Sequence, residues 1–298
     1  MSRRVRLALY GLFFVFVLML AVLVTFPWDS LARRLEEEVA RSSPGSTLVI
    51  GEIGPALPVG VRLANVVYQA EGKNGAPPSK WTVDRIRLKP AWLSLVRGRP
   101  GVTFDVDLLS GQLSGTATKS KDGASLSATF DHMLLDEGKT VEEALGVPLA
   151  GTLHGRLEAT TAADGKVTDA HLLATIEDAK VKGGKVAGFT LPAMDLGRPE
   201  VDLVVDKGEA KLTKCEAKGR DVTITATATS SLRPQLGLSP VKGQLKVKPT
   251  EAFLEKNPAL KAGLSLAGSF KKPDGSLDFP LNGTLVRPMS FPGFGGPR

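Results

Sequence analysis

Cysteine and histidine are nearly absent from this chain of 298 residues, and their scarcity excludes several kinds of site. Cys215 is the only cysteine, so the chain forms no internal disulfide and no cysteine-rich metal site. We expect the Cys215 side chain to be a small core residue, because free cysteines are usually buried. The three histidines, His132, His154 and His171, do not have the spacing of a metal-binding motif.

Catalytic motifs are also missing. The sequence contains no nucleophile-elbow motif, no phosphate-binding loop and no dinucleotide fingerprint. Asp131 and His132 are adjacent, but neighbours on a strand point to opposite faces, so we do not expect a dyad. Asp105 and Asp107 share one strand face, which a solvated surface explains. We therefore expect no catalytic, cofactor-binding or metal-binding residue, and a role in binding or assembly rather than as an envelope enzyme.

Aromatic residues and clusters of one charge are scarce too. Aromatic side chains make up 6% of the chain, and the net charge is +7. Apart from Arg3, Arg4 and Arg6, the excess positive charge is spread along the chain in single lysines. A surface that follows a nucleic-acid backbone needs a basic cluster. We therefore predict no nucleic-acid partner and only a mild attraction to anionic surfaces.

One long apolar run is present, near the start of the chain. Residues 7–26 contain no charged side chain, and about 20 helical residues span a hydrocarbon core of about 30 Å. The run is longer than the apolar part of a signal peptide, and no small-residue cleavage pattern follows it. These features favour a retained membrane anchor over a cleaved leader. The predicted anchor residues are Leu7, Leu12, Phe13, Phe14, Phe16, Leu20 and Phe26.

Three arginines before this run predict its orientation. Arg3, Arg4 and Arg6 form a positive flank, which the positive-inside rule keeps in the cytoplasm. Residues 1–28 are then a cytoplasmic tip and a transmembrane anchor that contacts membrane lipids. The predicted location is the cell inner membrane, single-pass, with the N-terminus in the cytoplasm and the bulk of the chain in the periplasm.

A short amphipathic helix is predicted over residues 29–45. Asp29 is a candidate N-cap, and Leu31, Leu35 and Val39 follow at intervals of four on one face. Such a helix either forms a stalk for a partner or covers one end of a sheet domain, and the second interpretation is favoured.

Period-two alternation dominates residues 46–288. Residues 102–108, 124–131 and 221–229 each place apolar side chains on one face and polar side chains on the other. Antiparallel sheets tolerate one solvated face, whereas parallel sheets are usually covered on both. The predicted fold class is therefore mainly β: an N-terminal transmembrane helix followed by an extended antiparallel sheet, in one piece or two.

Short connections between the predicted strands support an antiparallel sheet. Only two interior helices are expected, over residues 140–145 and 250–260, the second broken or kinked at Pro258. The tail over residues 289–298 is too rich in proline and glycine to fold alone, and it either frays or docks on a partner. Glycine-containing turns are predicted at residues 121–123, 164–166 and 206–208.

The order of these segments resembles a known family. A membrane helix is followed by a short Leu- and Glu-rich helix, two strand-like segments and long alternating strands. In this order the chain resembles the type II secretion system protein N (GspN) family and, more broadly, the AsmA-like periplasmic proteins. The segments that carry the resemblance are Phe26-Pro27-Trp28 and residues 48–53, 58–63, 201–229 and 243–249.

The resemblance implies a location, a shape and partners. It implies a periplasmic domain of the machinery that moves folded proteins through an outer-membrane secretin, with other secretion-system subunits as partners. The AsmA-like relation implies a curled sheet, a trough or half-barrel, with an apolar inner groove that could hold lipid. Two functions stay open: a non-enzymatic assembly component of type II secretion, or a lipid-binding or lipid-transfer module.

Overall fold

The computed structural model divides the chain into two compact units, Met1–Leu88 and Lys89–Arg298. Each unit is described by itself. The residues that the structure describes are 10, 13–14, 17, 25–43, 45–57, 59–70, 79–137, 148–186, 189–233, 235–266 and 272–285.

The named elements of the first unit, among the residues that the structure describes, are a helix and an antiparallel meander. The elements are α2 (Trp28–Ser42), β1 (Ser46–Pro55), β2 (Val61–Ala70) and β3 (Ser79–Pro90), whose last two residues belong to the second unit. β2 pairs with both β1 and β3. Helix α2 packs against β1, and the Glu36 carboxylate accepts a hydrogen bond from the Ile50 backbone N–H at 3.0 Å. Leu63 and Val66 of β2 are buried.

The amphipathic helix predicted after Pro27 is confirmed, but its cap is not. The helix begins at Trp28, and the N-cap position is Pro27, which makes no side-chain cap. Asp29 therefore lies in the first helical turn, where its negative charge interacts favourably with the helix dipole and stabilises the helix.

The second unit is a long antiparallel meander with short helices between or after its strands. Its elements are α3 (Trp92–Val96), β4 (Gly101–Leu108), β5 (Gly111–Lys119), β6 (Gly123–Leu134), η2 (Leu135–Glu137), β7 (Leu149–Ala162), β8 (Val167–Val181), β9 (Gly184–Val186), β10 (Phe189–Leu191), β11 (Met194–Gly197), β12 (Glu200–Asp206), β13 (Glu209–Lys218), β14 (Val222–Ser231), η3 (Leu236–Leu238), β15 (Pro240–Pro249), α5 (Glu251–Lys256), α6 (Pro258–Leu266) and β16 (Leu277–Thr284).

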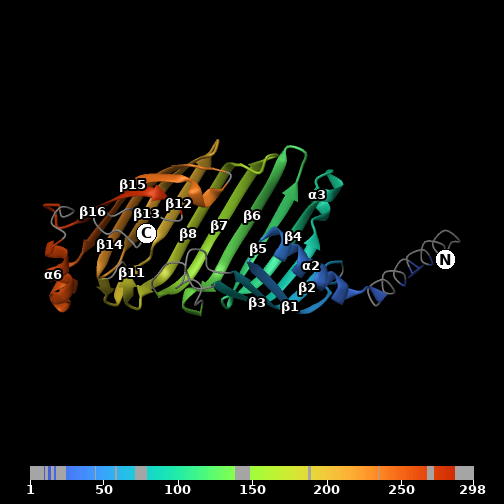
Figure 1. Cartoon of the computed structure of the whole chain (residues 1–298), viewed down its shortest axis with the longest axis horizontal. Helices are drawn as coiled ribbons and strands as arrows, with labels where there is room; N and C mark the ends of the chain where they lie inside the picture. Colours follow the sequence, from blue (N-terminus) through green and yellow to red (C-terminus); the bar gives the residue numbers. More distant parts are fainter. Residues whose placement is uncertain are drawn as a thin grey trace, which may run out of the picture. The chain divides into compact units, whose positions relative to one another are not determined.

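The strands of this unit pair almost entirely in chain order. The sheet runs β4-β5-β6-β7-β8-β12-β13-β14-β15-β16, and β11 pairs with β8 beside β12. Figure 1 shows β6, β7 and β8 side by side. Within the described part of the unit, β4 and β16 do not pair with each other, so the sheet is open. Strands β9 and β10 form a separate two-stranded ladder. The predicted mainly β, antiparallel fold is confirmed.

The predicted turns and one predicted interior helix are also found. Residues 121–123, 164–166 and 206–208 connect successive strands. Thr250 caps α5 by accepting a hydrogen bond from the Phe253 backbone N–H, and Pro258 begins α6, so the predicted break is present. The helix predicted over residues 140–145 lies outside the described residues. Helix α3 was not predicted, because five residues are too few to show a helical period.

The second unit has few large buried side chains. In the described part of the chain, the largest side chains that are completely buried are two serines, Ser239 and Ser276. Phe253 is the bulkiest buried apolar residue among the described residues of this unit, at 5% exposure, and three leucines are also buried: Leu135, Leu277 and Leu281. Most apolar strand residues are instead half-buried, as expected for a sheet with one face packed against little else.

Candidate functional site

The predicted membrane anchor falls mostly outside the described residues. Phe13, Phe14 and Phe26 are described, and their side chains are 63%, 67% and 40% exposed. Among the described residues, no helix is long and apolar enough to cross a membrane. The other predicted anchor and flank residues lie outside the described part; they are Leu7, Leu12, Phe16, Leu20, Arg3, Arg4 and Arg6.

The most extensive feature of the second unit is a continuous apolar face. In each of the ten strands of this sheet, from β4 to β16, one residue is paired with a residue of the following strand, and together these residues form a row across the sheet. Every member of this row is apolar or glycine. The row is Phe104, Gly115, Ala128, Leu157, Leu172, Leu203, Leu212, Ala228, Gly243 and Leu281.

Two further rows flank this one on the same face. The first flanking row is Val106, Leu113, Phe130, Gly155, Ala174, Val201 and Cys215. The second is Val102, Ala117, Leu126, Ala159, Ala170, Val205, Ala210, Ser230, Val241 and Gly283. No member of the three rows is charged. We call these three rows the apolar face.

The apolar face is not covered by a second layer from the described elements of its own unit. Leu157, Leu172 and Leu203, in the middle of the sheet, each remain partly exposed. Helix α3 contacts β4, the η2 turn contacts β7, and α5 contacts α6, so none of these elements packs extensively against the central strands. In most soluble proteins, a continuous apolar surface of this extent that remains partly exposed to water marks a binding surface.

The opposite face of the sheet is polar. Strand β14 places Thr223, Thr225 and Thr227 there, and β15 places Lys246 beside them. Charged pairs join neighbouring strands, for example Lys214 with Glu200 and His171 with Asp202, the latter at 3.1 Å. The alternation seen in the sequence therefore predicted both faces correctly.

Cys215 belongs to the apolar face and is only half-buried. Burial raises the pKa of the Cys215 thiol above its ordinary value. A thiol that stays protonated is a weak nucleophile, so Cys215 acts as a small apolar residue.

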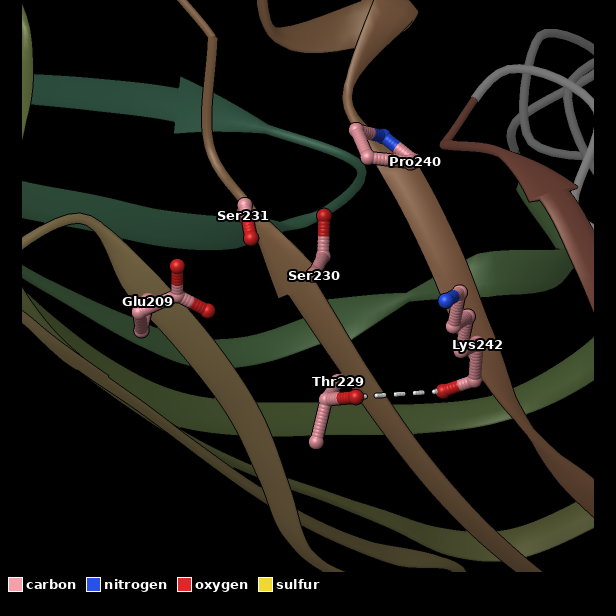
Figure 2. Close-up of a pocket in the computed structure, with 6 residues that line it drawn as sticks. All are labelled: Glu209, Thr229, Ser230, Ser231, Pro240 and Lys242. Atoms are coloured by element: carbon pink, nitrogen blue, oxygen red, sulfur yellow. Dashed lines mark hydrogen bonds between the residues drawn. The ribbon is translucent and has the colours of Figure 1, made fainter.

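A small hollow lies between β13, β14 and β15, and Figure 2 shows its lining. Thr229 Oγ1 donates a hydrogen bond to the Lys242 carbonyl at 3.5 Å. Ser230 Oγ is buried without a hydrogen-bond partner in the described structure. The lining residues are Glu209, Thr229, Ser230, Ser231, Pro240 and Lys242.

Two histidines and an aspartate meet on the polar face, contrary to the sequence-based expectation. Asp131 Oδ1 lies 2.8 Å from His132 Nδ1 and 3.2 Å from His154 Nδ1. The expectation that Asp131 and His132 point to opposite faces is wrong because β6 bulges here. The register against β7 shifts between Phe130 and Met133, and His132 has a φ of 51°.

The histidines determine the electrostatics of this cluster. The hydrogen bond with His132, supported by that with His154, holds the pKa of the Asp131 carboxyl below its usual 3.8, against a smaller effect of desolvation. On the other side of the His154 ring, Nε2 lies 4.0 Å from Glu177 Oε2. We call Asp131, His132 and His154 the His–Asp cluster.

Comparison with known protein families, characterised proteins and solved structures finds no match to this chain.

Proposed function

We propose that the chain is an inner-membrane-anchored, periplasmic and non-enzymatic component of the type II secretion system, with an assembly or accessory role toward the outer-membrane secretin. The observation that carries the proposal is the apolar face. The face has two uncharged rows across ten strands and a third across seven. Apolar surface that stays exposed to water costs about 25 cal/mol per Å². A partner that covers it removes that cost.

The order of the segments supports the assignment to secretion. The apolar run of residues 7–26, the amphipathic helix α2 and the long alternating strands follow each other as in the GspN family that the sequence resembles. Among the described strands, β16 pairs on one side only, and it is an additional docking point because an unpaired strand edge accepts a strand of another subunit.

The short helix α3 supports a place near a membrane. Leu93 and Val96 are 77% and 87% exposed, and no residue of α3 is buried. Trp92 is also exposed, and Arg97 and Arg99 follow the helix. An exposed tryptophan and leucines with adjacent arginines suit the interface between water and anionic lipid headgroups.

A second candidate function is an AsmA-like lipid-binding or lipid-transfer module. The length and the composition of the apolar rows favour it. Nine strand spacings of about 4.8 Å give an uncharged path of roughly 43 Å. The path is lined mainly by alanine, glycine, valine and leucine, which leave room for an acyl chain. Each methylene that leaves water on such a path contributes about 0.8 kcal/mol. In this function the sheet curls into a trough around the lipid.

Purification of the full chain from detergent-extracted membranes tests both functions. Recovery of the secretin or of inner-membrane platform subunits supports the secretion component. Phospholipid that stays bound through washing, measured by mass spectrometry, supports the lipid module. A protein that purifies with neither contradicts both proposals.

A further inference from the structure

We propose that the His–Asp cluster is a binding site for a divalent transition-metal ion, with Zn²⁺ the expected occupant. The site is independent of the apolar face, because its residues lie on the polar face of the same sheet. Asp131 and His132 are the two residues of the β6 bulge opposite His154. His154 lies between Leu153 and Gly155, which face the apolar side, so its side chain leaves the sheet on the polar side, where Asp131 Oδ1 lies 3.2 Å from its Nδ1.

The distances between the ligand atoms suit one small cation. One ligand atom from each of Asp131, His132 and His154 lies within 4.8 Å of the other two. Zn²⁺ binds histidine nitrogen and carboxylate oxygen at about 2.0–2.2 Å, so ligand atoms around a tetrahedral ion are roughly 3.3 Å apart. The two contacts of Asp131 Oδ1, 2.8 Å and 3.2 Å, need little adjustment. Two imidazoles and one carboxylate are ligands that Zn²⁺ accepts readily.

His154 Nδ1 faces the position of the proposed ion. Asp131 Oδ1 lies 3.2 Å from this nitrogen, and the His132 backbone N–H lies 3.5 Å from it, at the limit of hydrogen-bond distance. In the tautomer with its proton on Nε2, the Nδ1 atom carries a lone pair that can bind a metal ion. A cation between Nδ1 and Asp131 Oδ1 is then held by a lone pair on each side.

Glu177 lies beside the outer nitrogen of His154, beyond hydrogen-bond distance. Its carboxylate faces Nε2, the nitrogen of His154 that points away from the cluster, at 4.0 Å. Histidines that bind metal commonly give their other N–H to a carboxylate, which fixes the ring and makes the ligand nitrogen more basic. Arg198 pairs with Glu177 at 3.8 Å and helps to hold it in place.

The strands hold the cluster in a defined geometry. His132 joins Asp131 on one side of the sheet only because of the bulge in β6, and His154 comes from the neighbouring strand β7. The side chains of Asp131 and His132 are 61% and 74% exposed, so the ion remains open to solvent. Three protein ligands leave one position for water or for a ligand atom of a partner.

Metal binding to the full chain in detergent, prepared without a histidine tag, tests the proposal. Equilibrium dialysis against ZnCl₂ is expected to give one bound ion per chain at micromolar concentration. Co²⁺ is expected to give the strong visible absorption of a tetrahedral site. The double variant His132→Gln, His154→Gln is expected to weaken Zn²⁺ binding by more than about ten-fold.

His171→Gln is the matched control, because His171 also pairs with an aspartate on the polar face but has no second histidine beside it. Its Zn²⁺ affinity is expected to equal that of the parent protein, and circular dichroism checks that each variant folds. The proposal is overturned if the parent binds Zn²⁺ only at millimolar concentration. It is also overturned if the folded double variant keeps its affinity, or if His171→Gln loses as much.

Discussion

At the scale of single residues, the β6 bulge depends on a glycine in the neighbouring strand. A Cβ atom on Gly111 would lie 2.5 Å from the His132 carbonyl oxygen and 2.6 Å from that of Asp131. Both distances are shorter than real Cβ atoms show, and the obstacles are backbone atoms that cannot rotate away. Only glycine therefore lets β5 pair closely with the bulged part of β6.

We predict that Gly111→Ala lowers the free energy of unfolding by about 1–3 kcal/mol, the cost of forcing an extra methyl group into a packed site. Urea unfolding followed by circular dichroism measures the change. Gln112→Ala is the control, because Gln112 is exposed on the same strand and the change adds no atom there. Equal stabilities of the two variants would show that the bulge does not need the glycine.

A second residue, Asp195, joins β11 to the turn after β13. Its Oδ2 accepts hydrogen bonds from Arg220 Nε and Nη2 at 2.9 and 2.8 Å, and its Oδ1 accepts one from the Gly197 backbone N–H at 2.8 Å. The Arg220 guanidinium, with help from Gly197, holds the pKa of the Asp195 carboxyl below its usual 3.8. The folded state therefore favours the ionised carboxylate.

We predict that Asp195→Asn destabilises the protein at neutral pH by about 1 kcal/mol, the upper end for an ion pair near the surface. A carboxyl whose pKa is depressed in the folded state stabilises the fold above its unfolded pKa and loses this effect as pH falls through the folded pKa. The difference between the variant and the parent should thus shrink in denaturant titrations as the pH falls below 3.8, the usual carboxyl pKa. A difference that stays constant from pH 7 to pH 2 contradicts this origin.

At the scale of strands and helices, local pattern predicted most of what is found. The alternation at residues 221–229 became β14, and the turn at 206–208 joins β12 to β13, because both signals are contained in a few neighbouring residues. The His–Asp cluster could not be predicted in this way. It depends on a register shift against β7 and on Gly111 of β5, and neither is visible in the sequence around Asp131.

The apolar face was predicted strand by strand, but its continuity was not. Each alternating segment of the sequence shows that one side of its strand is apolar. To predict the row from Phe104 to Leu281, one must also know the register of nine successive strand pairings. Register is fixed by turns and bulges along the whole sheet. The sequence alone therefore left open how far the apolar face extends.

We predict that Ile224→Glu in β14 abolishes or strongly reduces the phospholipid that co-purifies with the protein. Ile224 lies on the same side of β14 as Ala228 of the apolar face, between Ala217 and Val247 of the neighbouring strands. A carboxylate there is costly to bring against an acyl chain. Thr223→Glu is the matched control on the polar side, between Lys218 and Lys248, where a negative charge is tolerated. Lipid content is measured by mass spectrometry after detergent extraction. If both variants keep their phospholipid, the lipid does not bind to the apolar face.

At the scale of the whole molecule, the proposed functions depend on the side of the membrane on which the sheet folds. The charge-free run of residues 7–26 and the arginine flank before it predict an anchor with the rest of the chain in the periplasm. The proposed secretion partners, the proposed lipid and the exposure of the proposed metal site to the envelope all require this arrangement.

The most direct test is a pair of reporters fused to the carboxyl end of the full chain. Alkaline phosphatase is active only after export, whereas green fluorescent protein fluoresces after synthesis in the cytoplasm. We expect an active phosphatase fusion, a dark fluorescent-protein fusion, and a membrane-bound product that keeps its N-terminal segment. A fluorescent fusion with an inactive phosphatase counterpart would contradict it.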